Sequence, residues 1–256
     1  MIFAIDIGNT NIVIGCIDDG GIVFKERIHT DTEKSIVEFA ISMKSILELH
    51  EVKPEEIAGG ILSSSVPQIT AAVKSAAQKI LGCDVMEVGP GIKTGLDIRI
   101  DNPAQLGADL AVVSVAGIRE YGAPLIIADM GTATSLIVIN SGKQVIGGML
   151  MPGVGISLES MRMRTAYLPK ISLEPPKKMI GSNTVDCMKS GILYGSAAAI
   201  DGMAERIFDE LGCKAKVVAT GGMAKKIIPF CRQEIIVDDE LMLKGLKLIY
   251  DRNVKA

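Results

Sequence analysis

The stretch FAIDIGNTNIVIGCIDDGGIV, residues 3–23, decides how this sequence folds. Two runs of apolar residues, typical of β-strands, are separated by Asp6, a glycine and small hydroxyl and amide side chains. The second run ends at Asp18-Asp19-Gly20-Gly21, which favours a tight hairpin turn before a third strand. We therefore expect three strands within residues 2–28, with polar side chains gathered where the first strand ends.

A second stretch, PLIIADMGTATSLIVINSGKQVIGGML at residues 124–150, repeats this pattern. A shift of 123 positions places Asp6 on Asp129, Gly8 on Gly131, Asn9 on Thr132 and Asn11 on Thr134. Strands that end in small residues before a helix also recur, in GGILSSSVP at 59–67 and KVVATGGMA at 216–224. Two halves with the same order of elements predict a duplicated α/β chain.

The remaining apolar periodicity alternates between helix and strand. It predicts helices over 32–50, 68–81 and 184–211, strands over 57–62 and 84–88, and a helix that begins near Pro103, with Asn102 as its cap and Gly122 as its end. Gly191 and Gly195 leave a smooth surface on the long helix, suited to internal or intersubunit helix packing. We place the domain boundary in the helix over 103–120, which gives domains 1–115 and 116–256.

Composition limits the classes of function. The 256 residues carry 27 Lys and Arg against 30 Asp and Glu, a formal net charge of −3, which argues against nucleic-acid or anionic-membrane partners. Five cysteines without a CxxC pair favour reduced core thiols over a metal or redox site. The opening residues run straight into a strand pattern, and no apolar run reaches the roughly 20 residues of a membrane span. We therefore expect a cytoplasmic protein.

The two acid-tipped loops, DIGNT and DMGTAT, suit phosphate chemistry. A carboxylate at the end of a buried strand can hold a cation, and glycine lets a phosphate approach the backbone. The following Asn and Thr residues and the backbone N–H groups can donate to phosphate oxygens. ATGGMA adds two glycines at a strand-to-helix turn, where a helix N-terminus offers positive potential. Each loop alone could be a simple turn, but the three in this order favour a polyphosphate site.

Eight motifs together resemble those of the type III pantothenate kinases, along nearly the whole chain. They are AIDIGNTNIVIG, SSSVP, NPAQLGAD, IIADMGTATS, GGMLMPG, RTAYLPKI, IGSNTVDCMKSGILYG and ATGGMA. That family belongs to the acetate/sugar kinase, heat-shock chaperone and actin superfamily. The resemblance implies an α/β fold of duplicated ribonuclease-H-like (actin-like ATPase) domains with a nucleotide cleft between them. It also implies phosphorylation of pantothenate to 4'-phosphopantothenate, the first step of coenzyme A biosynthesis, by a cytoplasmic homodimer that uses ATP, Mg²⁺ and K⁺ or NH₄⁺.

The resemblance also implies roles for individual residues. Asp109, in LGAD, matches the general base, Asp6 a carboxylate beside Mg²⁺–ATP, and Asp129 the ligand of the monovalent cation. Positions that match the ATP site are Asp6, Ile7, Gly8, Asn9, Thr10, Asn11, Ile12, Val13, Thr132, Gly221 and Gly222. Positions that match the pantothenate site are Ile100, Gly107, Ala108, Asp109, Leu110 and Thr184. From the residues alone, Thr184 is equally suited to cap the helix that follows it.

One residue departs from the family pattern. Leu110 stands where the family usually has an arginine, whose fork of donors can bind a carboxylate or phosphate in a bidentate manner. Ile100 replaces a residue that is often aromatic, and Arg162 or Arg164 could supply the missing cation. Two alternatives to a pantothenate kinase therefore stay open, namely a kinase of another small alcohol and a non-catalytic regulatory relative.

Overall fold

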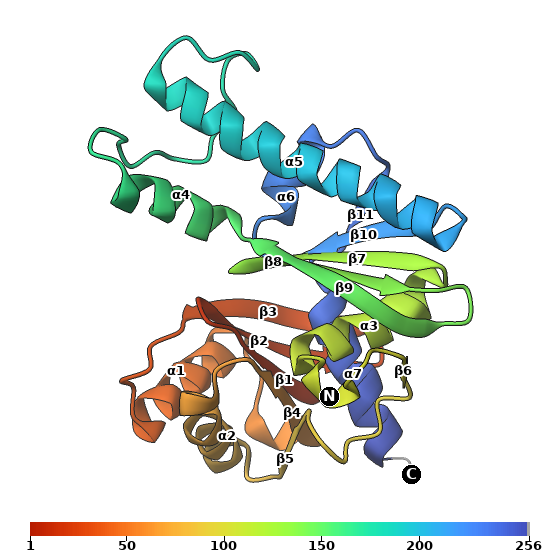
Figure 1. Ribbon diagram of the computed structural model, residues 1–256. Coiled ribbons are helices and arrows are strands. Elements are labelled where there is room, and N and C mark those ends of the chain that lie inside the picture. Colours follow the sequence, from red (N-terminus) through yellow and green to blue (C-terminus); the bar gives the residue numbers. More distant parts are fainter. Residues whose placement is uncertain (255–256) are drawn as a thin grey trace. The chain divides into compact units, whose positions relative to one another are not determined.

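The computed structural model describes residues 1–254 (Figure 1). By its contacts the chain divides into two compact units. Unit 1 contains Met1–Leu96, Asn102–Ala116 and the segment from Leu241, while unit 2 contains Asp97–Asp101 and Gly117–Glu240. The change of unit at residues 116 and 117 lies one residue from the boundary that the sequence predicts. The segment from Leu241, however, groups with unit 1, whereas the sequence assigns residues 116–256 to one domain.

The sheet of unit 1 has five strands in the order β3-β2-β1-β4-β5. The strands are β1 (Ile2–Ile7), β2 (Asn11–Asp18), β3 (Gly21–His29), β4 (Gly59–Ser64) and β5 (Val85–Glu87). β1 pairs antiparallel with β2 and parallel with β4. A hairpin connects β1 to β2, whereas the parallel partner β4 is reached through a crossover that contains a helix.

Helices cover both faces of this sheet. α1 (Ile36–Leu49) and α2 (Pro67–Leu81) pack on one face of the sheet (Figure 1). Phe3, Ile5 and Ile7 of β1 are buried on that face. On the other face, Ile2 and Ala4 form a cluster with α7 (Leu241–Val254) and with the first half of α3 (Ala108–Tyr121). Because side chains alternate along a strand, the side chain of Asp6 belongs to the α3 and α7 face.

Local signals set the helix ends in unit 1. Ser35 caps α1, where its hydroxyl accepts from the Glu38 N–H and the Glu38 carboxylate accepts from the Ser35 N–H, a capping box. Pro67 begins α2, and Gly82 ends it with a φ of 66°. The two helices predicted over 32–50 and 68–81 are confirmed, with bounds moved by a few residues.

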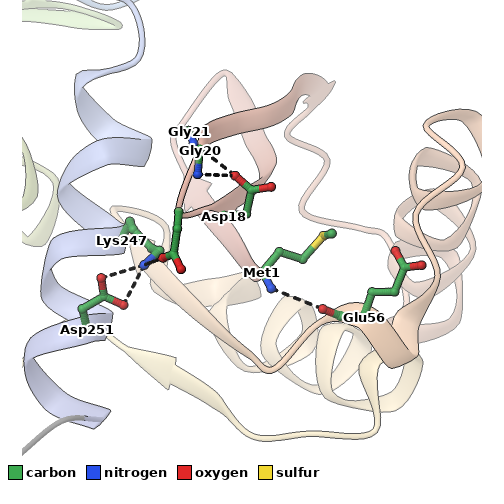
Figure 2. A network of polar contacts seen from close by, with 8 residues as sticks. Met1, Asp18, Gly20, Gly21, Glu56, Lys247 and Asp251 are labelled. Carbon is green, nitrogen blue, oxygen red and sulfur yellow. Dashed lines mark hydrogen bonds and ion pairs between the residues drawn. The ribbon is translucent and has the colours of Figure 1, made fainter.

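α7 is held to unit 1 by apolar and ionic contacts. Leu243, Leu246 and Ile249 are at most 1% exposed, and each such side chain contributes about 1.5–3 kcal/mol when fully buried. Figure 2 shows Lys247 of α7, whose Nζ lies 2.6 Å from Asp251 Oδ2 and 3.6 Å from the Asp19 carboxylate at the β2–β3 turn. In the same turn, Asp18 accepts hydrogen bonds from the backbone N–H groups of Gly20 and Gly21, as the predicted hairpin requires.

Unit 2 contains a six-stranded sheet in the order β11-β10-β7-β8-β9-β6. The strands are β6 (Asp97–Ile98), β7 (Leu125–Met130), β8 (Ala133–Ile139), β9 (Gln144–Pro152), β10 (Lys216–Thr220) and β11 (Ile235–Val237). The helices are α4 (Val154–Arg164), α5 (Thr184–Leu211) and the short α6 (Ala224–Ile227). Buried side chains of β7, β8 and β10 form one core with α5 and α6. Three 3₁₀ turns complete the described elements of the two units: Pro54–Glu56 and Pro103–Gln105 in unit 1, and Ile228–Phe230 in unit 2.

The predicted duplication is confirmed by strand order and pairing. Without β6, the order β9-β8-β7-β10-β11 repeats the order β3-β2-β1-β4-β5 of unit 1. In both sheets the central strand pairs antiparallel with the next strand and parallel with the strand that follows a crossover. A break in register also recurs, between Cys16 and Ile17 and between Val138 and Ile139. The fold is therefore the α/β fold of the actin-like ATPases, built from two copies of one arrangement.

Candidate active site

The first acidic strand end in unit 1 is Asp6, the penultimate residue of β1. In the parallel register of β1 and β4, Asp6 pairs with Ser63. The Ser63 hydroxyl donates to Asp6 Oδ1 over 2.8 Å, and the Ser63 residue is fully buried. The half-buried carboxylate is therefore held from the neighbouring strand, and its oxygens are hard donors of the kind that Mg²⁺ binds.

The loop after β1 has a fixed backbone and exposed side chains. The Gly8 N–H donates to the Asn11 carbonyl over 3.1 Å, and Thr30 Oγ1 donates to the Gly8 carbonyl over 2.6 Å. The Thr30 N–H also donates to the Thr10 carbonyl, over 3.0 Å. Asn9, Thr10 and Asn11 are exposed. The loop thus presents amide and hydroxyl side chains from a backbone that is held by Thr30, the residue after β3.

Not all residues assigned to the ATP site can offer a side chain to a ligand. Ile7 and Ile12 are 0% exposed and belong to the core beneath α1 and α2. Only their backbone groups could face a nucleotide, as in other loops where main-chain N–H groups bind phosphate. Val13 is half-buried on β2 and packs at the edge of the opposite cluster.

Asp129 is the matching strand end in unit 2, but the loop that follows is shorter. Met130 pairs with Thr134, whereas Ile7 pairs with Ile12 in unit 1, so three residues instead of four lie between the last paired positions of the hairpin. The alignment of Asn11 with Thr134 is therefore wrong. Thr134 is 5% exposed and lies within β8, while Thr132 is exposed in the loop. The Gly131 N–H closes this loop by donating to the Ala133 carbonyl over 3.0 Å.

Gly221 packs directly against Asp129. It follows β10 with a φ of 90°, and a Cβ at this position would lie 2.6 Å from Asp129 Oδ1 and 2.7 Å from the Met130 carbonyl carbon. The Met223 N–H donates to the Met130 carbonyl over 3.1 Å. The glycine turn and the acidic strand end therefore pack closely against each other, at a position where a residue with a Cβ would not fit.

One part of the prediction for this turn is wrong. The helix that follows the two glycines, α6, spans only four residues. A single turn supplies little of the aligned peptide dipole that makes a long helix N-terminus attractive to anions. Gly222 is exposed beside Gly221, so any ligand contact there depends on the open backbone and not on a helix N-terminus.

Asp109 lies in the first turn of α3, which begins at Ala108 and not near Pro103 as predicted. Asn102 does act as a cap, but of the 3₁₀ turn Pro103–Gln105, where its side chain accepts from the Ala104 N–H. Leu106 and Gly107 separate that turn from α3. The break leaves Asp109 close to the start of a helix, where the free N–H groups stabilise a carboxylate.

The Asp109 carboxylate is folded back onto its own backbone. Its Oδ1 accepts from the Leu110 N–H over 2.8 Å. The same oxygen occupies the space that a side chain on Gly107 would need. Further along α3, Val112 packs in the cluster that contains Ile2 and Ala4 of β1. Asp109 and Asp6 therefore lie on the same covered face of the unit 1 sheet.

The remaining predicted substrate contacts are distributed over both units. Gly107, Ala108 and Leu110 are half-buried in unit 1, while Ile100 is half-buried in unit 2. Thr184 is exposed as the first residue of α5 in unit 2. Its alternative role as helix cap is wrong, because the Asn183 side chain caps α5 by accepting from the Asp186 N–H over 2.9 Å.

The two candidate cations for the position of the missing arginine lie on α4. Arg162 Nε donates to Glu159 Oε2 over 3.1 Å, so its guanidinium is engaged by a neighbour on its own helix. Arg164 is the last residue of α4 and is exposed. Leu110 itself is half-buried and its carbonyl accepts from Ser114 Oγ over 2.7 Å.

Sequence reasoning missed three residues that shape the loops. Ser63 holds Asp6, Thr30 braces Gly8, and Gly153 lies so close to the unit 2 loop that a Cβ would be 2.7 Å from the Gly131 carbonyl oxygen. Ser63 and Gly153 lie in the motifs SSSVP and GGMLMPG, to which the sequence assigns no role, whereas Thr30 lies outside all eight motifs. Strand pairing, which no motif states, decides which of their residues meets the acidic strand end.

Clustered metal-binding side chains and membrane-spanning helices are both absent from the described part of the chain. Within residues 1–254, no three His, Cys, Asp or Glu side chains gather into a metal-binding group. In the same described part of the chain, no helix has both the length and the apolar character needed to span a membrane.

Comparison with solved structures supports the fold over the whole chain. A protein from Campylobacter jejuni assigned to the Baf family of transcriptional activators is 18% identical, with a TM-score of 0.57 and 100% of both chains covered. A second similar structure is an activator of 2-hydroxyisocaproyl-CoA dehydratase from Clostridium difficile, with bound ADPNP. It is 12% identical, with a TM-score of 0.56, and the match covers 100% of this chain and 97% of the activator. At such identities the likeness shows the fold alone.

A family comparison goes further than the fold. The sequence model of type III pantothenate kinase matches residues 2–206, which include Asp6, Asp109 and Asp129. The match covers both copies of the acid-tipped hairpin and ends within α5. This chain belongs to the type III pantothenate kinase family and is a phosphotransferase of that family.

Proposed function

We propose that the protein transfers the γ-phosphoryl group of ATP to the primary hydroxyl of pantothenate, giving 4'-phosphopantothenate in the first step of coenzyme A biosynthesis. The observation that carries the proposal is the family match over residues 2–206. The geometry supports it, because the two carboxylates assigned to chemistry, Asp6 and Asp109, share one face of the unit 1 sheet.

Asp109 is proposed as the general base. It accepts the proton of the substrate hydroxyl and aligns the oxygen for in-line attack on the γ-phosphorus. The hydrogen bond from the Leu110 N–H to Asp109 Oδ1 fixes the carboxylate at the start of α3. Positioning and charge stabilisation supply most of the acceleration in such transfers. Substrate contacts are proposed for Ile100, Gly107, Ala108, Leu110 and Thr184.

ATP is proposed to bind through the polar loops. In unit 1 these contacts come from Asp6, Ile7, Gly8, Asn9, Thr10, Asn11, Ile12 and Val13, and in unit 2 from Thr132, Gly221 and Gly222. The residues fit a nucleotide, because exposed amide and hydroxyl groups follow each acidic strand end and Gly221 occupies a turn that a Cβ would crowd. Asp6 would hold Mg²⁺ and Asp129 would hold K⁺ or NH₄⁺; both cations would neutralise phosphate charge.

A second candidate function follows from Leu110. A leucine cannot form the bidentate contact that an arginine makes with a carboxylate, and pantothenate is a carboxylate. A kinase of this fold that acts on an uncharged small alcohol would suit this change. The third possibility, a regulatory relative without turnover, would share the nucleotide loops and lack the acceptor reaction.

We also propose a cytoplasmic homodimer. A reaction that consumes ATP suits the cytoplasm. Unit 2 exposes many large apolar side chains between β9 and the start of α5, of the kind that subunit interfaces cover. They are Ile146, Leu150, Ile156, Met163, Tyr167, Met179, Ile180 and Val185. Gly191 and Gly195 on α5 have open space where a Cβ would lie, and of the two alternatives that the sequence leaves open we propose intersubunit packing. Sedimentation velocity at several concentrations tests the dimer.

A coupled assay of ADP release tests the function. With Mg²⁺ and K⁺ present, pantothenate is expected to stimulate ADP release in the wild type and not in Asp109→Asn. Replacing K⁺ by Na⁺ is expected to lower the rate, and Asp129→Asn is expected to remove that difference. Stimulation by an uncharged alcohol but not by pantothenate would favour the second candidate. No stimulation by any acceptor, with ATP still bound, would favour the regulatory relative.

A further inference from the structure

We propose that Ser63 is a positioning residue for the proposed reaction, since its buried hydroxyl fixes the Asp6 carboxylate in the orientation that binds Mg²⁺–ATP. The inference rests on the role proposed for Asp6 and adds a residue that the family resemblance does not assign. Ser63 does not touch the nucleotide in this account. It acts through Asp6 alone.

The contact is built by strand register. β1 and β4 are parallel neighbours, and Asp6 and Ser63 are register partners on the same face of the sheet. Ser63 is 0% exposed, and its Oγ lies 2.8 Å from Asp6 Oδ1. An ionised carboxylate only accepts hydrogen bonds, so the serine must be the donor. Bonds of this kind, to an ionised acceptor, are stronger than bonds between neutral groups.

The neighbouring serines show that this contact is specific to Ser63. Ser64 points to the opposite face, where its Oγ lies 2.7 Å from Thr70 Oγ1 and accepts from the Val66 N–H over 3.1 Å. The Ser65 N–H and hydroxyl both donate to the Ile7 carbonyl, over 2.9 and 3.1 Å. The three consecutive serines therefore have three different partners, and of the three it is Ser63 that contacts the Asp6 carboxylate.

The second copy of the fold has the same kind of residue at the matching position. In unit 2 the register partner of Asp129 is Thr220, which is 4% exposed. A buried hydroxyl residue thus stands beside the acidic strand end in both halves of the duplicated fold. The four residues of β4 that precede Ser63, Gly59–Leu62, are glycine or apolar. Packing alone therefore does not explain a hydroxyl group at position 63.

Fixing one carboxylate oxygen matters because Mg²⁺ demands near-octahedral geometry at short distances. A hydrogen bond to one carboxylate oxygen narrows the range of orientations in which that carboxylate can bind the ion. Hydrogen bonds that orient metal ligands typically change affinity or activity by about 10–100-fold when removed. We therefore expect the loss of the Ser63 hydroxyl to weaken the contribution of Mg²⁺ to nucleotide binding, without a change in pantothenate binding.

The test is isothermal titration calorimetry of ATP, with Mg²⁺ and with EDTA, for wild type, Ser63→Ala, Ser64→Ala and Asp6→Asn. Ser63→Ala is expected to bind Mg²⁺–ATP about 10–100-fold more weakly while its affinity for metal-free ATP stays unchanged. Ser64→Ala, matched in residue type and strand, is expected to bind as the wild type does. Ser63→Thr keeps the donor and is expected to restore most of the Mg²⁺–ATP affinity. Circular dichroism confirms that each variant is folded.

The outcomes separate this inference from the proposed function. A folded Ser63→Ala that binds Mg²⁺–ATP like the wild type overturns the role of Ser63. Equal binding by Asp6→Asn and wild type overturns it as well, together with the role of Asp6. Because calorimetry needs no acceptor, weak binding by Ser63→Ala supports the inference even if pantothenate is not phosphorylated. In the turnover assay, a higher Mg²⁺ requirement with an unchanged KM for pantothenate is the matching result.

Discussion

Gly107 makes room for the carboxylate of Asp109, because the Oδ1 atom of Asp109 occupies the space that a methyl group on Gly107 would need. The contact is with a side-chain atom and not with backbone, so an added methyl group can be accommodated only by turning the carboxylate away. A glycine two residues before the proposed base therefore sets where that base points.

Gly107→Ala is expected to lower kcat by at least about 10²-fold, the usual contribution of a positioned general base, with little loss of stability. Steady-state kinetics and thermal unfolding check the two parts of this prediction. Gly155→Ala is the control, because a Cβ on Gly155 meets no atom within 4 Å. Wild-type turnover by a folded Gly107→Ala would mean that the orientation of Asp109 in this structure is not the reactive one.

Gly221→Ala is expected to destabilise the protein by more than about 2 kcal/mol, from a positive φ that costs 1–2 kcal/mol and from contacts with Asp129 and Met130. Gly212→Ala is the matched control. Gly212 also has a positive φ, 67°, but open space where its Cβ would lie, so its cost is conformational alone. Urea unfolding followed by circular dichroism measures both. Equal losses in the two variants would contradict the close packing of Gly221 on the Asp129 loop.

Tyr121 and Asp238 form a hydrogen bond within unit 2 whose contribution depends on pH. The Tyr121 hydroxyl donates to Asp238 Oδ2 over 2.8 Å, and burial together with this bond raises the pKa of Tyr121 above its usual range. Tyr121→Phe is expected to lower stability by about 1–2 kcal/mol near neutral pH.

The difference between wild type and Tyr121→Phe is expected to shrink above about pH 10. There the tyrosine ionises in the unfolded chain while the folded state keeps its proton. Ionisation lowers the free energy of the unfolded state, so the stabilisation from the raised pKa is lost. Urea unfolding at intervals from pH 8 to 11 measures this. A difference that stays constant or grows with pH would contradict the assigned bond.

The cysteines are expected to differ widely in reactivity. Cys213 is exposed, whereas burial raises the pKa of Cys16 and of Cys231 to about 12. At pH 8 only about one in 10⁴ of such thiols is ionised, and the thiolate is the reactive form. Titration with a chromogenic disulfide should label Cys213 rapidly and spare Cys16 and Cys231 until the protein unfolds. Cys213→Ser should remove one rapid equivalent; rapid labelling of Cys16 would contradict its burial.

The sequence predicts the two sheets well, because alternating apolar runs and turn residues are local signals. The sequence correctly predicts the hairpin at Asp18–Gly21 and the long helix from Thr184 to Leu211. The sequence points to Asp6 and Asp129 because, in both places, an aspartate and a glycine interrupt a run of apolar residues that is typical of a buried strand. These features depend on residues within a few positions of one another.

Features that depend on distant partners could not be predicted in this way. The apolar face of α7 fits any core, and only packing shows that Leu243 and Leu246 lie against β1 and β4 in unit 1. The one-residue difference between the two loops depends on the pairing of Thr134 with Met130, which sequence alignment does not resolve. The contact between Ser63 and Asp6 likewise follows from the register of two strands 57 positions apart.

The proposed transfer of phosphate to pantothenate is tested most directly by following phosphorus during turnover. With ATP, Mg²⁺, K⁺ and pantothenate, ³¹P NMR is expected to show a new phosphomonoester that accumulates at the same rate as ADP, and mass spectrometry is expected to identify 4'-phosphopantothenate. Asp109→Asn should form neither product at a comparable rate. If ADP accumulates with inorganic phosphate and no phosphomonoester, or if Asp109→Asn matches the wild type, the proposed reaction is contradicted.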